Sequence, residues 1–236
     1  MRRRALPLLL LAAPVSRLAV PASLLAVPAW LLAVPASLLA VPALARSPRG
    51  IWFDPAQLPS FTGRLERWLM NPAGETDRAL LREGTQVILP PSEAAELTGA
   101  INVGDTITVW GVRARAAPVI TMLAWAKAEA DPANFVGQPA WFASTRRGTG
   151  NIRVAGSVDR ALLTPQGEPM GVLLKEGAVL RLGVGQHAGL AARLAAGVAL
   201  VAEGPGTRRG EDIAIDAIRL GPDADHLADV APEPAP

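Results

Sequence analysis

The sequence predicts a mainly β protein with two tandem five-stranded barrels, each with a short helix between its third and fourth strands. Two observations lead to this prediction. The chain repeats itself at an offset of 93 residues, so that 61–125 align with 154–218 without a gap and 18 of the 65 pairs are identical, where composition alone gives about one in fifteen. Within each copy, short alternating apolar runs are separated by Gly and Pro turns, as in small β domains.

In the first copy, alternation and turn chemistry predict each element in order. Pro90-Pro91 ends the third strand, and Ser92 is placed to cap a helix that ends near Ala100. Three strands, a helix and two strands are the order of an OB-fold, a partly open Greek-key barrel, although a split sandwich remains an alternative. The predicted strands are 61–70, 76–81, 85–89, 106–112 and 119–125.

The first 45 residues have the layout of a secretory signal. Three arginines precede an apolar run, and Ala43-Leu44-Ala45 matches a cleavage site. Prolines at 14, 21, 28, 35 and 42 disfavour a straight transmembrane helix, but a retained anchor is the alternative. We therefore expect an exported, periplasmic protein. Its expected segments are a signal peptide (1–45), an OB-like domain (46–125), a linker (126–150), a second OB-like domain (151–220) and a disordered tail (221–236).

The charge balance gives no support to polyanion binding. Removal of the leader takes four arginines and no acid, which leaves 19 basic against 21 acidic residues. The chain has no cysteine, so it forms no disulfide and has no thiolate chemistry.

The first copy contains Asn71-Pro72-Ala73-Gly74-Glu75, then Glu83-Gly84-Thr85, then Pro90-Pro91. It resembles a group of bacterial OB-fold-like proteins of unassigned function, in which N-P-x-G-E-x-D-G-x-L-L-x-D-G-T-x-V-x-x-P-P recurs. Arg78 stands where that pattern has glycine, and the second copy has Gly183-Val184 in place of the double proline. The resemblance implies a fold and export, and it carries no catalytic residues.

OB barrels usually bind ligands through the loops that join strands 1 to 2 and strands 4 to 5. Those loops are expected at 71–75 and 113–118 in the first copy and at 164–168 and 206–211 in the second. Arginines in the second loop of each copy could hold phosphate or carboxylate groups, or could simply be solvated. The candidate ligand-binding residues are Asn71, Glu75, Arg113, Arg115, Glu168, Arg208 and Arg209.

Charges retained in both copies form a second constellation. Arg67 falls in phase with the apolar residues of its strand, so it either faces the core with an acidic partner or marks a β-bulge. We prefer this structural role over a ligand site. The retained residues are Arg67, Glu75, Glu83 and Arg115, and they recur as Arg160, Glu168, Glu176 and Arg208.

Aromatic residues suggest an alternative function. Trp110 is a candidate for base stacking, but its counterpart is Glu203, so no stacking residue repeats. The pairs Trp52-Phe53 and Trp141-Phe142 precede the two copies, and we expect them to plug the open barrel ends rather than to form a ligand platform.

Nothing in the sequence indicates catalysis. The histidines His187 and His226 lack metal-ligand spacing, and the carboxylates Glu75 and Asp77 make a weak acid/base pair. We expect no cofactor and no metal. The sequence therefore predicts a non-enzymatic OB-fold protein that binds a protein, glycan or small ligand through its barrel-rim loops. A single-stranded nucleic-acid binder and a structural envelope protein are the alternatives, and membrane contact is expected only if the leader is retained.

Overall fold

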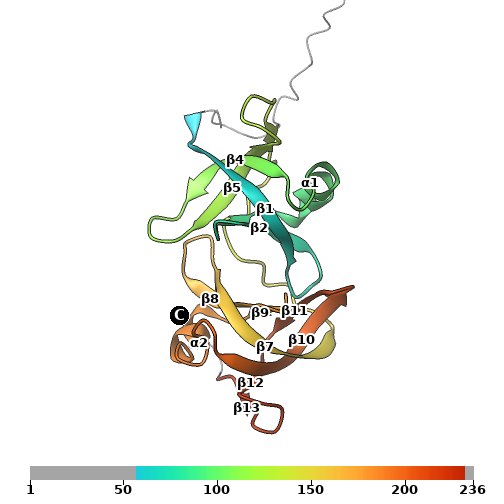
Figure 1. Ribbon diagram of the computed structural model, residues 1–236, viewed down its shortest axis with the longest axis vertical. Coiled ribbons are helices and arrows are strands. Elements are labelled where there is room, and N and C mark those ends of the chain that lie inside the picture. The colour runs from blue at the N-terminus through green and yellow to red at the C-terminus, as the bar shows by residue number, and fades with distance from the viewer. Residues whose placement is uncertain (1–56, 232–236) are drawn as a thin grey trace, which may run out of the picture. The chain divides into compact units, whose positions relative to one another are not determined.

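The computed structural model describes residues 57–231, which form two β-sheets (Figure 1). The predicted leader, the pair Trp52-Phe53 and the last five residues of the predicted tail lie outside the described residues. The first sheet contains β1 (Ser60–Met70), β2 (Thr76–Leu81), β3 (Gln86–Ile88), β4 (Thr106–Arg113), β5 (Val119–Ala126) and β6 (Asn134–Phe135), with α1 (Ala94–Ala100) after β3. The second contains β7 (Gly150–Leu163), β8 (Pro169–Leu174), β9 (Val179–Arg181), β10 (Ala199–Arg209), β11 (Asp212–Asp216), β12 (Arg219–Gly221) and β13 (Ala228–Asp229), with α2 (Val184–Gly189) after β9.

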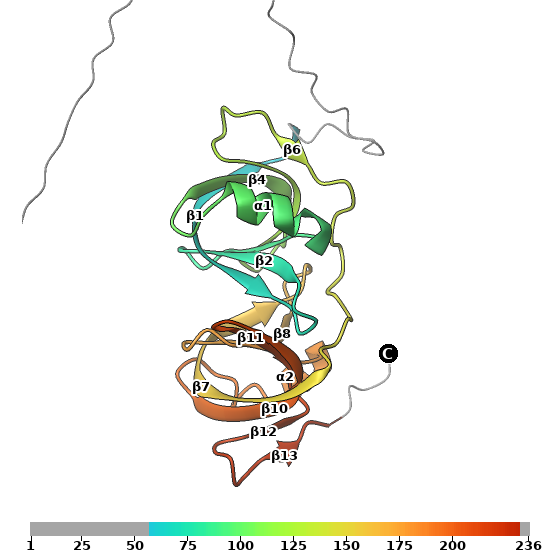
Figure 2. The ribbon, with the colours of Figure 1, turned by 90° about the vertical axis from the view of Figure 1, so that its right-hand side faces the viewer.

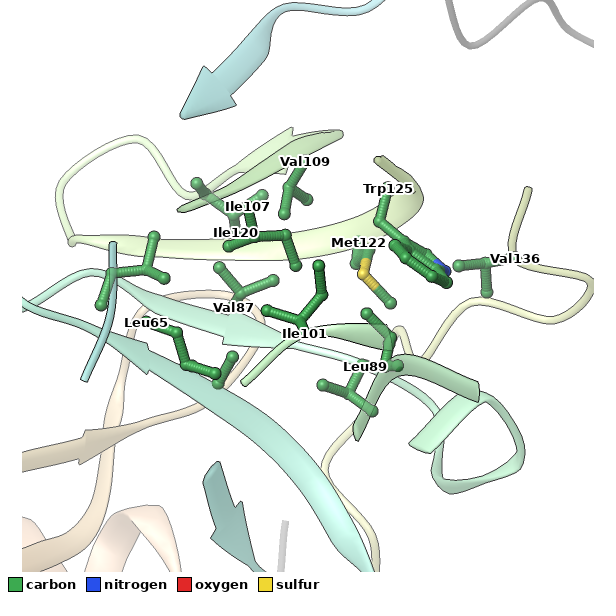
Figure 3. Close-up of a cluster of buried hydrophobic side chains, with 13 residues drawn as sticks. Leu65, Val87, Leu89, Ile101, Ile107, Val109, Ile120, Met122, Trp125 and Val136 are labelled. Atoms are coloured by element: carbon green, nitrogen blue, oxygen red, sulfur yellow. The ribbon is translucent and has the colours of Figure 1, made fainter. Parts of the chain in front are cut away.

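The first sheet closes into a five-stranded barrel. Its strands follow the order β3-β2-β1-β4-β5-β6, and β3 also pairs in parallel with β5, which closes β3, β2, β1, β4 and β5 into a ring and leaves β6 at its edge. The inward side chains form one apolar cluster that includes Leu65, Val87 and Met122 (Figure 3). Leu97 from α1 belongs to the same cluster. Each such fully buried side chain contributes about 1.5–3 kcal/mol. The mainly β class and one closed five-stranded barrel are confirmed.

A β-bulge allows the long strand β1 to pair with two neighbouring strands. The N-terminal half of β1 pairs with β4 and its C-terminal half with β2, and the register shifts between Leu65 and Arg67. A bulge adds a residue on one strand, which bends and twists it. In β7 the same shift lies between Val158 and Arg160. Of the two structural alternatives for Arg67, the bulge is therefore the one observed.

The second sheet has a similar pairing pattern. Its order is β11-β9-β8-β7-β10-β12-β13, and β11 pairs in parallel with β9 and antiparallel with β10. β8 and β9 follow β2 and β3 at the same offset of 93 residues. One difference is that the fifth strand of the first copy corresponds to two short strands, β11 and β12. This sheet encloses its own apolar cluster, which includes Val172, Leu180 and Ile215.

One local prediction is corrected. Ser92 does not cap the helix: a 3₁₀ turn over Pro91–Glu93 precedes α1, and no side-chain hydrogen bond caps either of them. Pro91 has a fixed φ that suits a first helical position, and this starts the turn earlier than the serine would. The segments 126–150 and 221–231 contain the short strands β6 and β13.

A further set of apolar side chains lies between the two sheets. Leu69 and Leu80 of the first sheet pack with Leu162 and Leu173 of the second. In the repeat alignment Leu69 is equivalent to Leu162, and Leu80 to Leu173. The two sheets therefore contact each other through the same face.

A glycine of each half also lies close to an arginine of the other half, and the two pairs are equivalent in the repeat. A Cβ atom on Gly84 would lie 3.3 Å from Nη1 of Arg160, and one on Gly177 would lie 3.5 Å from Nη1 of Arg67. Gly84 and Gly177 are equivalent, as are Arg67 and Arg160. The repeat thus retains these pairs where each half contacts the other.

Candidate functional site

The four loops that the sequence analysis selected as ligand rims meet in two crosswise pairs. Loop 71–75 contacts loop 206–211, since the Thr207 hydroxyl donates to the carbonyl of Pro72 at 2.8 Å. Loop 113–118 contacts turn 164–168, where a Cβ atom on Gly167 would lie 2.7 Å from Cβ of Ala117. Each loop is thus partly covered by a loop of the other half.

Asn71 holds its own turn together. Its side chain is only 3% exposed, its Oδ1 accepts from the backbone N–H of Glu75 at 3.1 Å, and its Nδ2 donates to the Glu75 carboxylate at 3.1 Å. Thr164 does the same in the second half, because its hydroxyl accepts from the N–H of Glu168 at 3.1 Å. These contacts place Asn71 in the scaffold of the site.

The predicted arginines separate into different surroundings. Arg113 lies over the ring of Phe61, 5.9 Å from its centroid, which is a cation–π distance. Arg113 and Arg115 line a shallow hollow formed by 113–118. Arg208 and Glu168 are exposed. Arg209 is also exposed, and it lines a larger groove.

That groove has a volume of about 1040 Å³, at the upper limit of the usual range for ligand sites. β2, the end of β3 and α1 form its floor and one side, the segment 138–146 forms the other side, and Arg209 reaches in from the second half. Its floor is apolar at Ile88 and Leu89, and its polar groups include Glu75 and Asp77. Among the predicted site residues, the groove brings together Glu75 and Arg209.

We call the segment 138–146 the strap. It belongs to the chain between β6 and β7, which runs beside both sheets (Figure 2). Arg181, only 8% exposed, donates from Nη2 to the carbonyl of Arg146 at 2.6 Å and from Nη1 to the carbonyl of Ser144. Nε and Nη2 of the same guanidinium bind both carboxylate oxygens of Asp216, at 2.5 and 3.0 Å.

Two more contacts hold the strap. Arg146 forms an ion pair with Glu75, and the side chain of Gln166 donates to the carbonyl of Trp141 at 2.9 Å. The strap is therefore fixed at Trp141, Ser144 and Arg146 while the groove beside it stays open.

The strap presents two aromatic side chains to solvent. Trp141 is 42% exposed and Phe142 is 81% exposed, and both line the groove. The expectation that this pair plugs the end of the second barrel is wrong, because both rings are exposed and neither belongs to the apolar cluster of the second sheet. Trp110, the predicted stacking residue, is half-buried on β4 between Ser60 and Ala124 and does not line the groove.

Asp77 is the residue of the groove that sequence reasoning undervalued. Burial raises the pKa of its carboxyl above the ordinary 3.8, although the nearby Arg78 and Arg181 oppose this shift. A carboxyl with a pKa raised by burial in an open groove is a candidate functional group. The sequence repeat offered a signal. The position equivalent to Asp77 in the second copy holds Met170, so this carboxylate is not one of the residues that the two copies share.

Arg78 connects the floor of the groove to the second half. It is 4% exposed, and its Nη1 donates to Oε1 of Gln86 and to the carbonyl of Leu163, both at 2.6 Å. Burial lowers its pKa, while the neighbouring Asp77 acts in the opposite direction.

The histidines lie elsewhere. His187 is on α2, where burial lowers its pKa, and its Nε2 is buried with no hydrogen-bond partner. The exposed His226 contacts Asp223 through Nδ1 at 2.7 Å. Within 57–231, no cluster of His, Asp and Glu residues could hold a metal ion. Over the same residues, no helix combines the length and apolarity needed to cross a membrane.

The chain matches no protein-family model, and no curated protein matches it. Among solved structures it is similar to a deletion mutant of the single-stranded DNA binding protein from Thermus aquaticus. The two share 17% sequence identity with a TM-score of 0.21, over 75% of this chain and 96% of that chain. At this TM-score the similarity carries no argument about fold or function.

Proposed function

We propose that this chain is an exported, non-enzymatic binding protein of two tandem OB-like barrels, and that it takes its ligand in the groove between α1, β2 and the strap. The exposed Trp141-Phe142 pair is the observation that carries the proposal. Large aromatic side chains are costly to leave in water, and they concentrate at recognition surfaces. Here they line a groove of ligand size.

The tandem barrels are supported by the repeat and by the strand pairings. β11 pairs with both β9 and β10, as β5 pairs with both β3 and β4. The leader pattern at 1–45 supports export to the periplasm. Mass spectrometry of the native N-terminus tests it, and a chain that begins at Arg46 is the expected result.

The chemistry of the groove favours binding over catalysis. Asp77 and Glu75 are the carboxylates in the groove, and Glu75 is already engaged by Arg146. General acid/base catalysis needs a group free to exchange its proton beside the reacting atoms, usually with a second group. A non-enzymatic role is therefore part of the proposal.

Single-stranded nucleic acid is the competing ligand, and the aromatic pair with Arg146 and Arg209 is what favours it. Bases stack on such rings and phosphates bind guanidinium groups. Glu75 and Asp77 in the same groove need hydrogen-bond donors, which phosphates do not offer, so we place it second.

Intrinsic tryptophan fluorescence tests the proposal. Titration with a soluble glycan, a peptide mixture and an oligothymidylate should show a saturable change for one ligand, and Trp141→Ala with Phe142→Ala should abolish it. Quenching by oligothymidylate with a steep salt dependence would establish the nucleic-acid alternative. No response to any of these ligands would favour a structural envelope role.

A further inference from the structure

The groove combines hydrogen-bond donors and acceptors with aromatic faces. Arg146 and Arg209 can only donate, whereas the ionised Glu75 can only accept. Ser92 and Thr98 add hydroxyls that do both. A ligand that satisfies this mixture must carry many groups that both donate and accept, which is the property of sugar hydroxyls.

The aromatic pair fits the same chemistry. Trp141 and Phe142 are adjacent in the chain and both line the groove. The C–H face of a pyranose ring is apolar and packs on an aromatic ring, while the hydroxyls at the ring edge remain available for hydrogen bonds. A nucleic-acid backbone offers phosphate oxygens that only accept, so it leaves Glu75 and Asp77 without hydrogen-bond donors.

Two arginines, Arg146 and Arg209, line the groove together with the carboxylates Glu75 and Asp77. Arg146 is 71% exposed at its side chain and uses Nη1 for Glu75. Within residues 57–231, Arg209 forms no ion pair. A guanidinium without a carboxylate partner binds a ligand carboxylate in a two-point geometry.

On these grounds we infer that the ligand of the groove is an acidic saccharide. Its sugar rings stack on Trp141 and Phe142, and its carboxylate binds Arg209 and the free edge of Arg146. This inference rests on the proposed function and adds the chemical class of the ligand. Asp77 and the hydroxyls on the α1 side receive the hydrogen bonds of the sugar hydroxyls.

The experiment uses trigalacturonate as the probe and its full methyl ester as the matched neutral control. Binding to the whole chain is measured by tryptophan fluorescence and by calorimetry at two salt concentrations. Trigalacturonate should bind, and the ester should bind at least about ten-fold more weakly, since it lacks the charge that Arg209 recognises. Arg209→Ala should reduce this difference, whereas Arg193→Ala, an exposed arginine outside the groove, should leave it unchanged.

The stacking part has its own variants. Trp141→Ala should abolish binding, and Trp141→Phe should restore most of it by calorimetry, because a phenyl ring still offers a face to the sugar. Circular dichroism confirms that each variant remains folded.

Each of the other outcomes would overturn one specific part of the inference or of the proposed function. Equal affinity for the acid and the ester, with loss of binding in Trp141→Ala, overturns the acidic class and leaves the groove as a saccharide site. Binding of oligothymidylate in place of both sugars overturns the saccharide inference while the groove function stands. Binding that survives Trp141→Ala and Phe142→Ala together lies outside the groove and overturns the proposed function.

Discussion

The side chain of Gln86, on β3 of the first sheet, forms a hydrogen bond with the backbone of Leu163 on β7 of the second sheet. The N–H of Leu163 donates to Oε1 of Gln86 at 3.1 Å, and Nε2 of Gln86 donates to the carbonyl of Ala161 at 2.8 Å. Arg78 completes the arrangement by donating to both Oε1 of Gln86 and the carbonyl of Leu163. The amide of Gln86 thus forms hydrogen bonds with two backbone groups near the C-terminal end of β7. The two halves are therefore joined by polar as well as apolar contacts.

Replacing this amide should destabilise the protein. Gln86→Ala leaves the N–H of Leu163 and the carbonyl of Ala161 without these bonds, and it deprives Arg78 of an acceptor. Buried polar groups without partners cost about 1–3 kcal/mol each, so a loss of about 2–4 kcal/mol in the free energy of unfolding is expected in urea titrations. Gln57→Ala, at an exposed glutamine, is the control, and equal stability of the two variants would contradict the bridging role.

The contact between loops 71–75 and 206–211 can be tested at a glycine. Gly74 has φ +84°, and an added Cβ would lie 2.8 Å from Cγ2 of Thr207. Gly104 has φ +92° with open space around it, so Gly104→Ala measures backbone strain alone, about 1 kcal/mol. Thermal unfolding should show a larger loss for Gly74→Ala.

A second-site change checks the cause of that larger loss. Thr207→Ser removes the Cγ2 methyl that would clash and keeps the hydroxyl that donates to Pro72. Adding it to Gly74→Ala should recover the excess over Gly104→Ala. No recovery would mean that the loops are not in contact in solution.

Limited proteolysis reports on the strap. The carbonyl of Arg146 is bonded to Arg181, and this carbonyl belongs to a peptide bond that trypsin recognises. Arg181→Met removes the contacts to Ser144 and Arg146 together, so cleavage after Arg146 should become markedly faster. Cleavage after the exposed Lys127 is the internal control, and equal acceleration at both sites would indicate global unfolding instead.

The raised pKa of Asp77 predicts a pH dependence of stability. The folded protein holds the Asp77 proton more tightly than the unfolded chain, so ionisation of this carboxyl costs stability as the pH rises from 3.8 through the raised pKa. Asp77→Asn should therefore raise the melting temperature at pH 7 and should have a smaller effect at pH 3. A larger gain at pH 3 than at pH 7 would contradict this sign.

The strands were predictable because their information is local. The range 76–81 was predicted and observed without change, and 61–70 differs from β1 by one residue. Alternation of apolar residues and the turns at Gly74 and Gly84 fix these elements within a few residues of chain. The predicted Ser92 cap was wrong because Pro91 starts a 3₁₀ turn before it. Proline at a first helical position and serine at a cap are competing local signals, and residue propensities alone do not decide between them.

The groove was only partly predictable. Glu75 and Arg209 were selected as loop residues, but Trp141 and Phe142 were assigned to a barrel plug and Asp77 was discounted. The strap carries no strand or helix pattern, and its position follows from Arg181 and Gln166, which are distant in sequence.

The sequence by itself determined the repeat, the strand order and the turns, because each of these depends on residues that are neighbours in the chain or equivalent at a fixed offset. Only the tertiary structure decided that the predicted rim loops contact each other crosswise and that the strap forms one side of the groove. Those arrangements depend on which surfaces bury apolar area and satisfy the polar groups of Arg78, Gln86 and Arg181. A buried hydrogen bond between distant residues leaves no periodic trace in the sequence of either one.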